Sequence, residues 1–486
     1  KVEKLPAEIT PAFAKSLEGK HGLLTLKLQK SEAGEISGVP FVVPGGRFNE
    51  MYGWDSYFEA LGLLQDGRID LAKALVDNFI YEIEHYGKIL NANRSYYLTR
   101  SQPPFLTSMA LSVYEALPQN DHSKEWLKMA LRAAIQEYHT VWMNKDRLTE
   151  TGLSRYYGSG IGVPPEVEPD HFDEIFQEFA DKHHFGLAEF KKRYKAGEIN
   201  DAELDAFFRH DRAVRESGHD TTYRWRRNGD DRGANFVTVD LNSLLYKYEI
   251  DIAYILKEVF DDAISSEKSG EWAARAQGRK ALLLKYLWND HKKMFFDYDF
   301  VNRVQSDYIS ATTFYPLWAW RPHQPETRIL DEQAAERCIH AALSHLESNG
   351  GVLSTAQESR ERYGIAGLER QWDYPFGWAP HQILIWQALR NYGQDQIAGR
   401  LIYKWLYTIV RNAENYNGTI PEKYNVVTRS HKVFAEYGNV GTEFSYMTRE
   451  GFGWMNASYQ IGLNLLSGEW RASLEKLVPP EWVDFH

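Results

Sequence analysis

Length, composition and charge already exclude several classes of function. The chain has 486 residues and a formal net charge of −11. This acidic balance argues against a nucleic-acid groove or an anionic membrane surface as partner and is easier to reconcile with a neutral ligand. The single cysteine, Cys338, excludes an internal disulfide and a Cys-based metal cluster. We interpret it as a small buried apolar residue.

The sequence shows neither a membrane-spanning segment nor a secretory signal. The sequence contains no run of about 18 apolar residues that would span a bilayer. Its first ten residues, KVEKLPAEIT, lack the apolar stretch of a secretory signal. Together with the single cysteine, this favours a reducing, cytoplasmic compartment. Because the chain opens on Lys1 rather than Met, we expect an upstream part to be missing.

Apolar residues recur at helical spacing along most of the chain. The first such region, 58–86, is interrupted only around Asp66 and Gly67 and predicts a helical hairpin. An irregular polar loop is predicted at 91–102, and the segment 294–299 (MFFDYD) is the best candidate for a short strand. Further helices are predicted at 105–116, 124–142, 238–260, 271–287, 332–346, 378–392, 396–415 and 453–466. This alternation of helices and loops predicts an all-α fold built as a large helical array.

The segment 172–215 is strongly charged and also has a helical period. We interpret it as surface helices inserted between loops, because acidic residues at such spacing more often form a solvated face than a metal site. The adjacent His183 and His184 cannot share one helix face as metal ligands do. The glycine-rich stretch 158–162 (GSGIG) lacks the strand and lysine of a phosphate loop and predicts a plain turn.

Two aromatic stretches stand out as candidate ligand-binding segments. The first, 44–63 (PGGRFNEMYGWDSYFEALGL), brings Arg47, Trp54 and Asp55 close together just before a helical pattern. The second, 371–380 (QWDYPFGWAP), is too aromatic for an ordinary loop and too broken for a helix interior. An indole offers a flat apolar face to a sugar ring, while a guanidinium and a carboxylate bind hydroxyl groups in fixed directions. These stretches therefore favour a polyhydroxylated ligand.

Two acidic residues occur in segments with unusual backbone. Asp220 lies in ESGHDTTYRW, after Gly218, and Glu422 lies in GTIPEKYN, after Pro421. Cleavage of a glycosidic bond requires one protonated carboxyl group and one ionised carboxylate on opposite sides of the anomeric carbon. Either residue alone is more simply interpreted as a helix cap or an ion-pair member.

Together these stretches resemble the signatures of the trehalase family, the inverting hydrolases of α,α-trehalose, over about 41–457. The resemblance implies an (α/α)6 barrel with the active site at one end, an N-terminal extension at 1–40 and a catalytic domain at 41–486 with an insertion at about 172–215. It implies Asp220 as general acid and Glu422 as general base, about 6.5 to 9.5 Å apart. The substrate contacts that it implies are Arg47, Trp54, Asp55, Asn91, Arg100, Gln102, Glu166, Arg215 and the backbone at Gly218.

The chain departs from the family pattern in two places. Pro164 replaces an arginine that bacterial relatives tend to carry two positions before the equivalent of Glu166, which leaves Arg215 as the alternative source of that contact. The glycine-rich segment after Glu422 is diluted here, and we expect a lid that is stiffer or that needs outside help to close. Glu443 in this segment is a further candidate contact.

The resemblance is strongest to the fungal neutral trehalases. It implies trehalose as the ligand and no metal in the chemistry. Calcium and a 14-3-3-type regulator are implied only through an upstream region that this sequence does not contain.

Two other functions are compatible with the same residues. One is a glucoamylase-like inverting α-glucosidase on the same barrel, and the other is a non-catalytic sugar-binding or sensing module.

Overall fold

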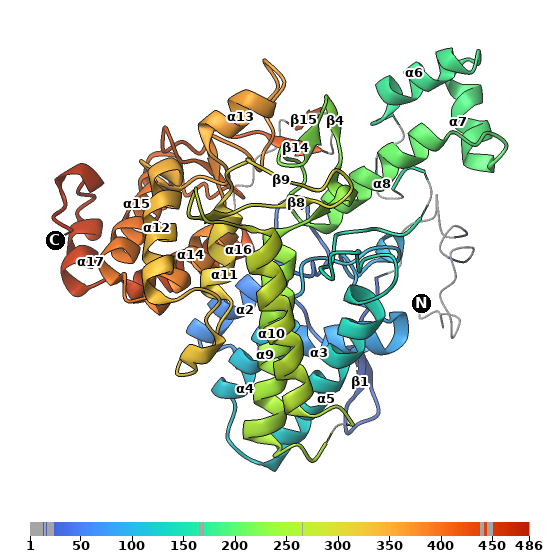
Figure 1. The fold of residues 1–486 in the computed structure, drawn as a ribbon. Coiled ribbons are helices and arrows are strands. Elements are labelled where there is room, and N and C mark those ends of the chain that lie inside the picture. Colours follow the sequence, from blue (N-terminus) through green and yellow to red (C-terminus); the bar gives the residue numbers. More distant parts are fainter. Residues whose placement is uncertain are drawn as a thin grey trace.

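Most of the chain forms antiparallel helix pairs, because its apolar residues recur at helical spacing (Figure 1). The structure is a computed structural model. It describes residues 24–160, 162–164, 167, 170–264, 266–437, 442–444 and 451–485, together with Phe13 and Ser16, but not the side chains of 435–437 and 442–444.

The helices agree closely with the predicted ones, with ends that shift by a few residues. The longer ones are α2 (Asp55–Gln65), α3 (Ile69–Tyr86), α4 (Leu106–Ala116), α5 (Asp121–Glu137), α6 (Asp173–Lys182), α7 (Leu187–Ala196), α8 (Ala202–Glu216), α9 (Val239–Tyr254), α10 (Ser269–Tyr286), α12 (Glu332–Leu346), α14 (Ala379–Asn391), α15 (Asp395–Asn415) and α16 (Gly453–Leu465). Shorter ones are α11 (Tyr315–Trp318), α13 (Gln357–Tyr363) and α17 (Gly468–Glu475), and single π-helical turns extend α5 (Tyr138–Trp142) and α9 (Ile255–Val259).

Six helices form a closed inner ring within the described part of the chain. Helix α2 contacts α4, α4 contacts α9, α9 contacts α11, α11 contacts α14, α14 contacts α16, and α16 returns to α2. Helices α3, α5, α10 and α15 pack outside this ring against their sequence neighbours, and α10 runs along α9 in Figure 1. Because inner and outer helices alternate along the chain, the inner helices run in one direction and begin at one end of the barrel.

Burial explains why these helices are inside. Helix α9 is buried along nearly its whole length, and the core around it is built from large apolar side chains. The outer helix α5 instead carries an amphipathic pattern, and the side chain of Asn120 caps its N-terminus by accepting a hydrogen bond from the Ser123 amide. Cys338 is buried in the same core, and burial raises the pKa of its thiol to about 12. Its interpretation as a buried apolar residue is confirmed.

Strands are few and short within the described residues. The predicted strand at 294–299 contains β7 (Met294–Phe295), which pairs with β6 (Trp288–Asn289), and β8 (Tyr298–Asp299), which pairs with β5 (Phe236–Val237) and β9 (Val304–Gln305). The remaining two-stranded pairs are β1 (Leu28–Lys30) with β2 (Ile36–Gly38), β3 (Arg226–Arg227) with β4 (Asp230–Asp231), β10 (Glu347–Ser348) with β11 (Gly351–Val352), β12 (Phe376–Gly377) with β13 (Tyr424–Asn425), and β14 (Ala435–Tyr437) with β15 (Thr442–Phe444).

The charged segment 172–215 forms α6, α7 and α8, as predicted, and projects from the barrel (Figure 1). The interpretation of the whole segment as surface helices is wrong for the end of α8, where Asp211 and Arg215 are buried. The segment has an aromatic core of its own that includes Phe176, Phe190 and other apolar residues. The division of the chain at residue 40 stays a prediction.

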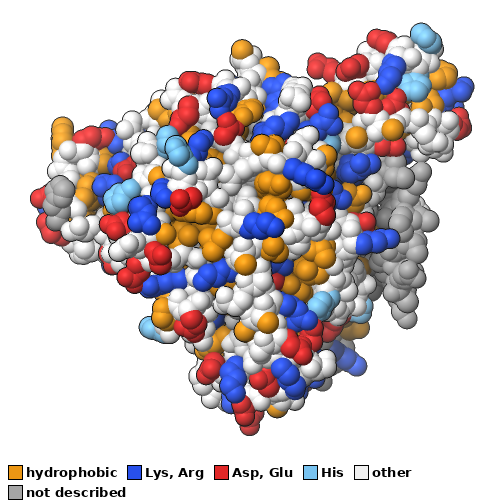
Figure 2. Space-filling model, viewed as in Figure 1, with side chains coloured by type: hydrophobic (Ala, Val, Ile, Leu, Met, Phe, Trp, Pro, Cys, Tyr) orange, Lys and Arg blue, Asp and Glu red, His pale blue; other side chains and the backbone are white. Residues whose placement is uncertain are grey.

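The molecular surface carries mixed charge. On the face in Figure 2, acidic and basic side chains are interspersed rather than gathered into one-sign regions. Among the described helices, none has both the length and the apolarity to cross a bilayer.

The contact that closes the ring predicts a stability effect. At Gly62 of α2, an added Cβ would lie 2.8 Å from the Cβ and 3.0 Å from the Cα of Ala457 on α16. We expect Gly62→Ala to destabilise the protein by about 1–3 kcal/mol, because α2 and α16 must separate. The matched control is Gly278→Ala on α10, where nothing lies within 4 Å; it removes a helical glycine without a clash and is expected to be neutral or stabilising. Equal midpoints of urea unfolding for the two variants would contradict this packing.

Candidate active site

One pocket lies at the end of the barrel where the inner helices begin. Its walls come from the segments that lead into α2, α4, α14 and α16, and from loops that follow α8 and α15. The inner helices start at this end because outer and inner helices alternate, so residues far apart in sequence converge there.

Ten of the twelve predicted site residues line this single pocket. They are Arg47, Trp54, Asp55, Asn91, Arg100, Gln102, Arg215, Gly218, Asp220 and Glu422. Glu166 lies outside the described residues. Glu443 lies in β15, where it pairs with Glu436 on β14, but its side chain is not described.

Eight further residues line the pocket that were not predicted as individual site residues. They are Phe48, Tyr52, Tyr97, Gln371, Trp372, Trp378, Phe452 and Trp454. A signal for several of them was present in the sequence, because Gln371, Trp372 and Trp378 belong to the aromatic stretch 371–380 and Phe48 to the stretch 44–63. Phe452 and Trp454 lie at the end of the diluted glycine-rich segment, 436–454.

Tryptophans form one connected aromatic wall. The rings of Trp372 and Trp378 stack at 4.1 Å with an interplanar angle of 4°. The ring of Trp54 lies 5.5 Å from that of Trp372, and it forms a T-shaped pair with the ring of Trp454 at 5.8 Å. Flat, rigid indole faces suit the C–H surface of a sugar ring. The pocket is therefore shaped by side chains that lose little entropy on binding.

Polar side chains on the same wall are held by local hydrogen bonds. The Asn91 side-chain amide donates to the Ser101 carbonyl at 3.2 Å, and the Gln102 side-chain oxygen accepts from the Trp54 amide at 3.0 Å. Arg215 donates through Nε to Asp211 at 2.8 Å. These bonds fix the orientation of the polar groups before any ligand arrives.

Asp220 is a buried acid of this pocket whose pKa departs from its usual value. Burial raises its pKa to about 6, although the nearby Arg215 and Arg100 guanidinium groups oppose that rise. Desolvation disfavours the charged carboxylate, since a buried ion loses its water shell. Asp220 therefore holds its proton at a pH where an exposed aspartate has lost it.

Asp55 and Glu59 are stacked one helical turn apart at the start of α2. Burial, and then the charge of Glu59, hold the pKa of Asp55 well above its usual range. Burial raises the pKa of Glu59 to about 8. Asp55 is accordingly able to present a protonated carboxyl to the pocket, which both donates and accepts hydrogen bonds.

Glu422 has a different environment from Asp220. Lys423 Nζ lies 2.9 Å from the Glu422 Oε1, and the lysine side chain is completely buried. The Trp454 indole N–H donates to the Glu422 carbonyl at 3.0 Å. A lysine at this distance compensates the charge of an ionised carboxylate.

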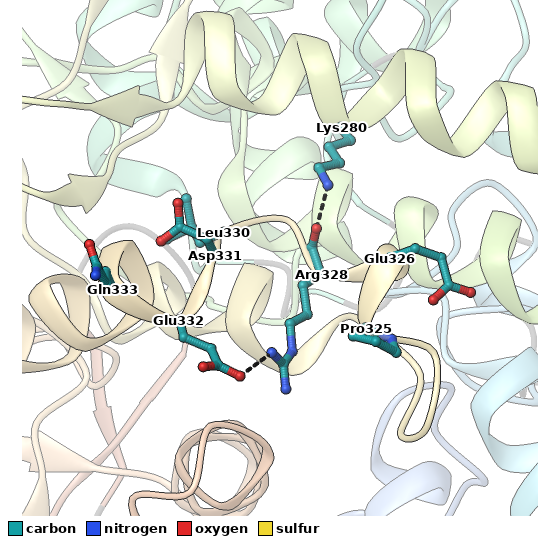
Figure 3. Close-up of a pocket in the computed structure, with 8 residues that line it drawn as sticks. All are labelled: Lys280, Pro325, Glu326, Arg328, Leu330, Asp331, Glu332 and Gln333. Carbon is teal, nitrogen blue, oxygen red and sulfur yellow. Dashed lines mark hydrogen bonds and ion pairs between the residues drawn. The ribbon is translucent and has the colours of Figure 1, made fainter.

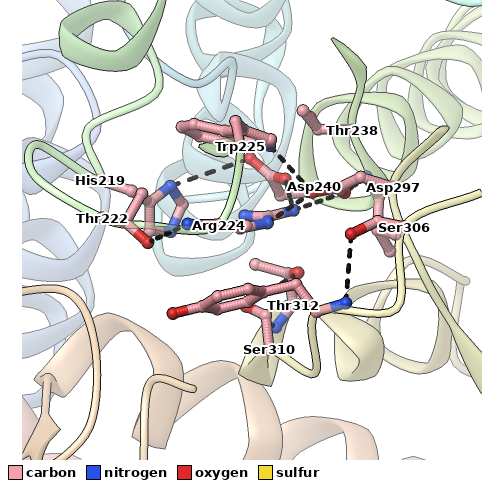
Figure 4. Close-up of polar contacts among 12 residues, drawn as sticks. His219, Thr222, Arg224, Trp225, Thr238, Asp240, Asp297, Ser306, Ser310 and Thr312 are labelled. Atoms are coloured by element: carbon pink, nitrogen blue, oxygen red, sulfur yellow. Dashed lines mark hydrogen bonds and ion pairs between the residues drawn. The ribbon is translucent and has the colours of Figure 1, made fainter. Parts of the chain in front are cut away.

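A buried ionic network supports the loop that follows Asp220 (Figure 4). Arg224 binds Asp297 through Nε at 2.6 Å and Nη2 at 2.7 Å, and reaches Asp240 at 2.7 Å. The Trp225 indole also donates to Asp297 at 2.9 Å. His219 faces Asp240 in this network, and burial lowers the pKa of His219 to about 4. The network holds in place the side chains of His219 and Arg224, which flank Asp220 in the sequence.

A second hollow on the surface lacks these features. It lies between α10 and the start of α12 and is lined by Lys280, Pro325, Glu326, Arg328, Leu330, Asp331, Glu332 and Gln333 (Figure 3). Arg328 is paired with Glu332 at 2.6 Å, and Lys280 donates to the Arg328 carbonyl. No aromatic side chain is among these described lining residues, so the aromatic pocket is the better candidate for an active site.

Comparison with known proteins decides the family. A sequence model described as trehalase matches residues 1–467. The chain belongs to the trehalase family. The cytosolic neutral trehalase of Emericella nidulans is 48% identical over 503 residues, which cover 99% of this chain and 65% of the relative. The cytosolic neutral trehalase of Saccharomyces cerevisiae is 48% identical over 495 residues, covering 99% of this chain and 64% of the relative. This member of the trehalase family thus spans less than two thirds of the length of these curated relatives.

Solved structures support the fold. The neutral trehalase Nth1 from Saccharomyces cerevisiae matches this trehalase-family chain with a TM-score of 0.86 at 45% identity, covering 98% of this chain and 83% of that one. A GH63 mannosylglycerate hydrolase from Thermus thermophilus matches with a TM-score of 0.54 at 19% identity, covering 86% of this chain and 95% of that one. This second match shows a similar fold and nothing more. The predicted (α/α)6 toroid is confirmed.

Clustered metal ligands are not found in the part of the chain that the structure describes. It contains no group of three or more His, Cys, Asp or Glu side chains arranged to hold a metal ion.

The close contact between Gly218 and Trp54 predicts a defect local to the pocket. Gly218 has a φ of +73°, and an added Cβ would lie 2.7 Å from the Trp54 indole. We expect Gly218→Ala to displace Trp54 and to change the near-UV circular dichroism of the tryptophan wall, with destabilisation of about 1–3 kcal/mol.

Gly197→Ala is the matched control, because Gly197 has a φ of +74° but no atom within 4 Å. It carries the backbone strain without the clash. An unchanged tryptophan spectrum in Gly218→Ala, or the same change in Gly197→Ala, would contradict the contact.

Proposed function

We propose that this chain hydrolyses α,α-trehalose to two glucose molecules with inversion at one anomeric carbon. One observation carries the proposal: Asp220 and Glu422 line the same aromatic pocket, yet burial raises the pKa of Asp220 whereas Glu422 lies against a buried lysine. A carboxyl pair whose two members have different surroundings is typical of the acid and the base of a glycosidase. Membership of the trehalase family and the names of the relatives point to the same substrate.

In the proposed reaction, Asp220 donates its proton to the glycosidic oxygen as the bond from that oxygen to the anomeric carbon breaks. Glu422 accepts a proton from a water molecule whose oxygen forms the new bond on the opposite face of the same carbon. Asp220 ends ionised and Glu422 ends protonated, and exchange with solvent restores both. Inversion requires room for that water, about 6.5 to 9.5 Å between the two carboxyl groups.

Substrate positioning is assigned to the remaining pocket residues. Arg47, Arg100 and Arg215 provide directional donors for hydroxyl groups, and the tryptophan wall covers the apolar faces of the sugar rings. Glu166 and Glu443 stay candidates from the family resemblance. No metal takes part in this scheme, because both proton transfers are made by carboxyl groups.

The setting of the whole protein is also proposed from its relatives. Those compared above are named cytosolic neutral trehalases, and we assign this chain to the cytosol. Control by calcium or by a 14-3-3-type protein, through residues other than 1–486, stays an expectation from the family resemblance.

Proton NMR of a fresh trehalose digest tests the proposal most directly. Inversion at one carbon yields β-glucose, while the other ring leaves as α-glucose, so the two anomers are expected to appear first in equal amounts. Maltose in a parallel digest serves as the specificity control and is expected to remain intact. Excess α-glucose at the earliest time points would contradict inversion, and cleavage of maltose but not trehalose would contradict the substrate.

The raised pKa of Asp220 predicts the alkaline side of the pH profile. Asp220 acts only while protonated, and its pKa is about 6, so kcat/KM for trehalose is expected to fall tenfold per pH unit above about pH 6. Bound substrate excludes water and disfavours the carboxylate further, so kcat is expected to fall at a higher pH than kcat/KM.

Asp220→Asn provides the control for this assignment. It is expected to lose about 10²- to 10⁴-fold in kcat for trehalose, and its residual activity is expected to lack the alkaline decline. If the same decline persists in Asp220→Asn, the group that titrates is not Asp220.

A further inference from the structure

Lys423 is a buried lysine to which the proposed reaction assigns no role. Its side chain has no exposure to solvent, and it is not among the described residues that line the pocket. Its Nζ lies 2.9 Å from Glu422 Oε1 and 3.2 Å from the side-chain oxygen of Gln371. Burying an ammonium group is costly, so these oxygen partners must offset the lost hydration.

Gln371 extends this contact to the other carboxyl-bearing segment. Its side-chain Nε2 donates to the backbone carbonyl of Asp220 at 2.6 Å, while its Oε1 accepts from Lys423. One planar amide therefore bridges the two segments. A continuous path runs from the Asp220 carbonyl through Gln371 and Lys423 to the Glu422 carboxylate.

Aromatic residues hold this path in place. Lys423 Nζ lies 4.9 Å from the ring of Trp378 and 5.8 Å from that of Phe376, distances at which a cation is attracted to an aromatic face. The Trp378 indole N–H donates to the Gln371 carbonyl at 2.7 Å. Strand β12 pairs with β13, which begins one residue after Lys423. The lysine is thus fixed on several sides.

We propose that Lys423 is a positioning residue which, together with Gln371, sets the place of the Glu422 carboxylate relative to the loop that carries Asp220. This inference rests on the proposed function, because it assigns Glu422 the role of base. Lys423 acts through Glu422 and not on the sugar. Its loss is therefore expected to slow the chemical step without weakening substrate binding.

Lys423→Met is the decisive variant, since methionine keeps much of the side-chain volume and removes the charge. We expect kcat for trehalose to fall by about 10²-fold, the cost typical of misplacing a reacting group by about 1 Å. KM is expected to stay within about threefold of wild type. A kcat within threefold of wild type would overturn the proposal.

α-Glucosyl fluoride separates the base side from the acid side. Its leaving fluoride needs no proton, so Asp220→Asn is expected to hydrolyse it far better than it hydrolyses trehalose. Lys423→Met and Glu422→Gln are expected to be impaired on both substrates, because water still needs its base. Recovery of Lys423→Met on the fluoride would place the lysine on the acid side and overturn the proposal.

Lys247→Met controls for the loss of a buried lysine. Lys247 is buried, is paired with Asp251 at 2.5 Å and does not line the pocket. It is expected to lower the melting temperature while leaving kcat unchanged at a temperature where the variant is folded. A similar kcat loss in Lys247→Met would reduce the Lys423 effect to general destabilisation and overturn the proposal.

Gln371→Met tests the same path if Lys423→Met fails to fold. It is expected to lower kcat on both substrates, and the double variant is expected to be no worse than the more impaired single variant, because both changes break one path. Additive losses would overturn the proposal.

A wild-type chain that cleaves neither substrate refutes the proposed function itself, whereas an active wild type with an unaffected Lys423→Met refutes only this inference.

Discussion

The structure depends on a difference in electrostatic environment between two carboxyl groups in one pocket. Burial removes the water shell of Asp220 and raises its pKa to about 6, although two nearby arginines oppose that rise. Glu422 is largely buried beside the ammonium group of Lys423. If both groups were equally desolvated, or equally paired with a cation, one could not serve as the acid while the other served as the base. The separate surroundings of the two groups are therefore what the rest of the fold has to maintain.

The closed ring of helices provides that separation. Asp220 follows α8, whose buried end is tied to the barrel through Glu216, which binds Arg147 and the amides of Ser101 and Tyr157. Glu422 follows α15 and lies in the segment that leads into β13. Since each segment is fixed to a different part of the ring, the distance between the carboxyl groups is set by the scaffold and not by the loops alone.

Much of this arrangement was predictable because its signals are local. The helical period located the helices to within a few residues, the aromatic stretch 44–63 placed Trp54 and Asp55 in a ligand site, and the family resemblance added Arg100. The buried end of α8 was misjudged, because the charges of Asp211 and Arg215 resemble a solvated face unless their pairing partners are known. Trp454 was missed for a related reason. Its role depends on the return of α16 to α2, a contact between the two ends of the barrel sequence that no local pattern encodes.

The most direct measurement is a crystal structure of this chain with a non-hydrolysable trehalose analogue bound. The account predicts that the carboxyl group of Asp220 contacts the atom that replaces the glycosidic oxygen. It also predicts that the Glu422 carboxylate lies about 6.5 to 9.5 Å from the Asp220 carboxyl group, with a water molecule between Glu422 and the anomeric carbon. A separation of about 5 Å, typical of a retaining enzyme, or an analogue bound away from these two residues, would contradict it.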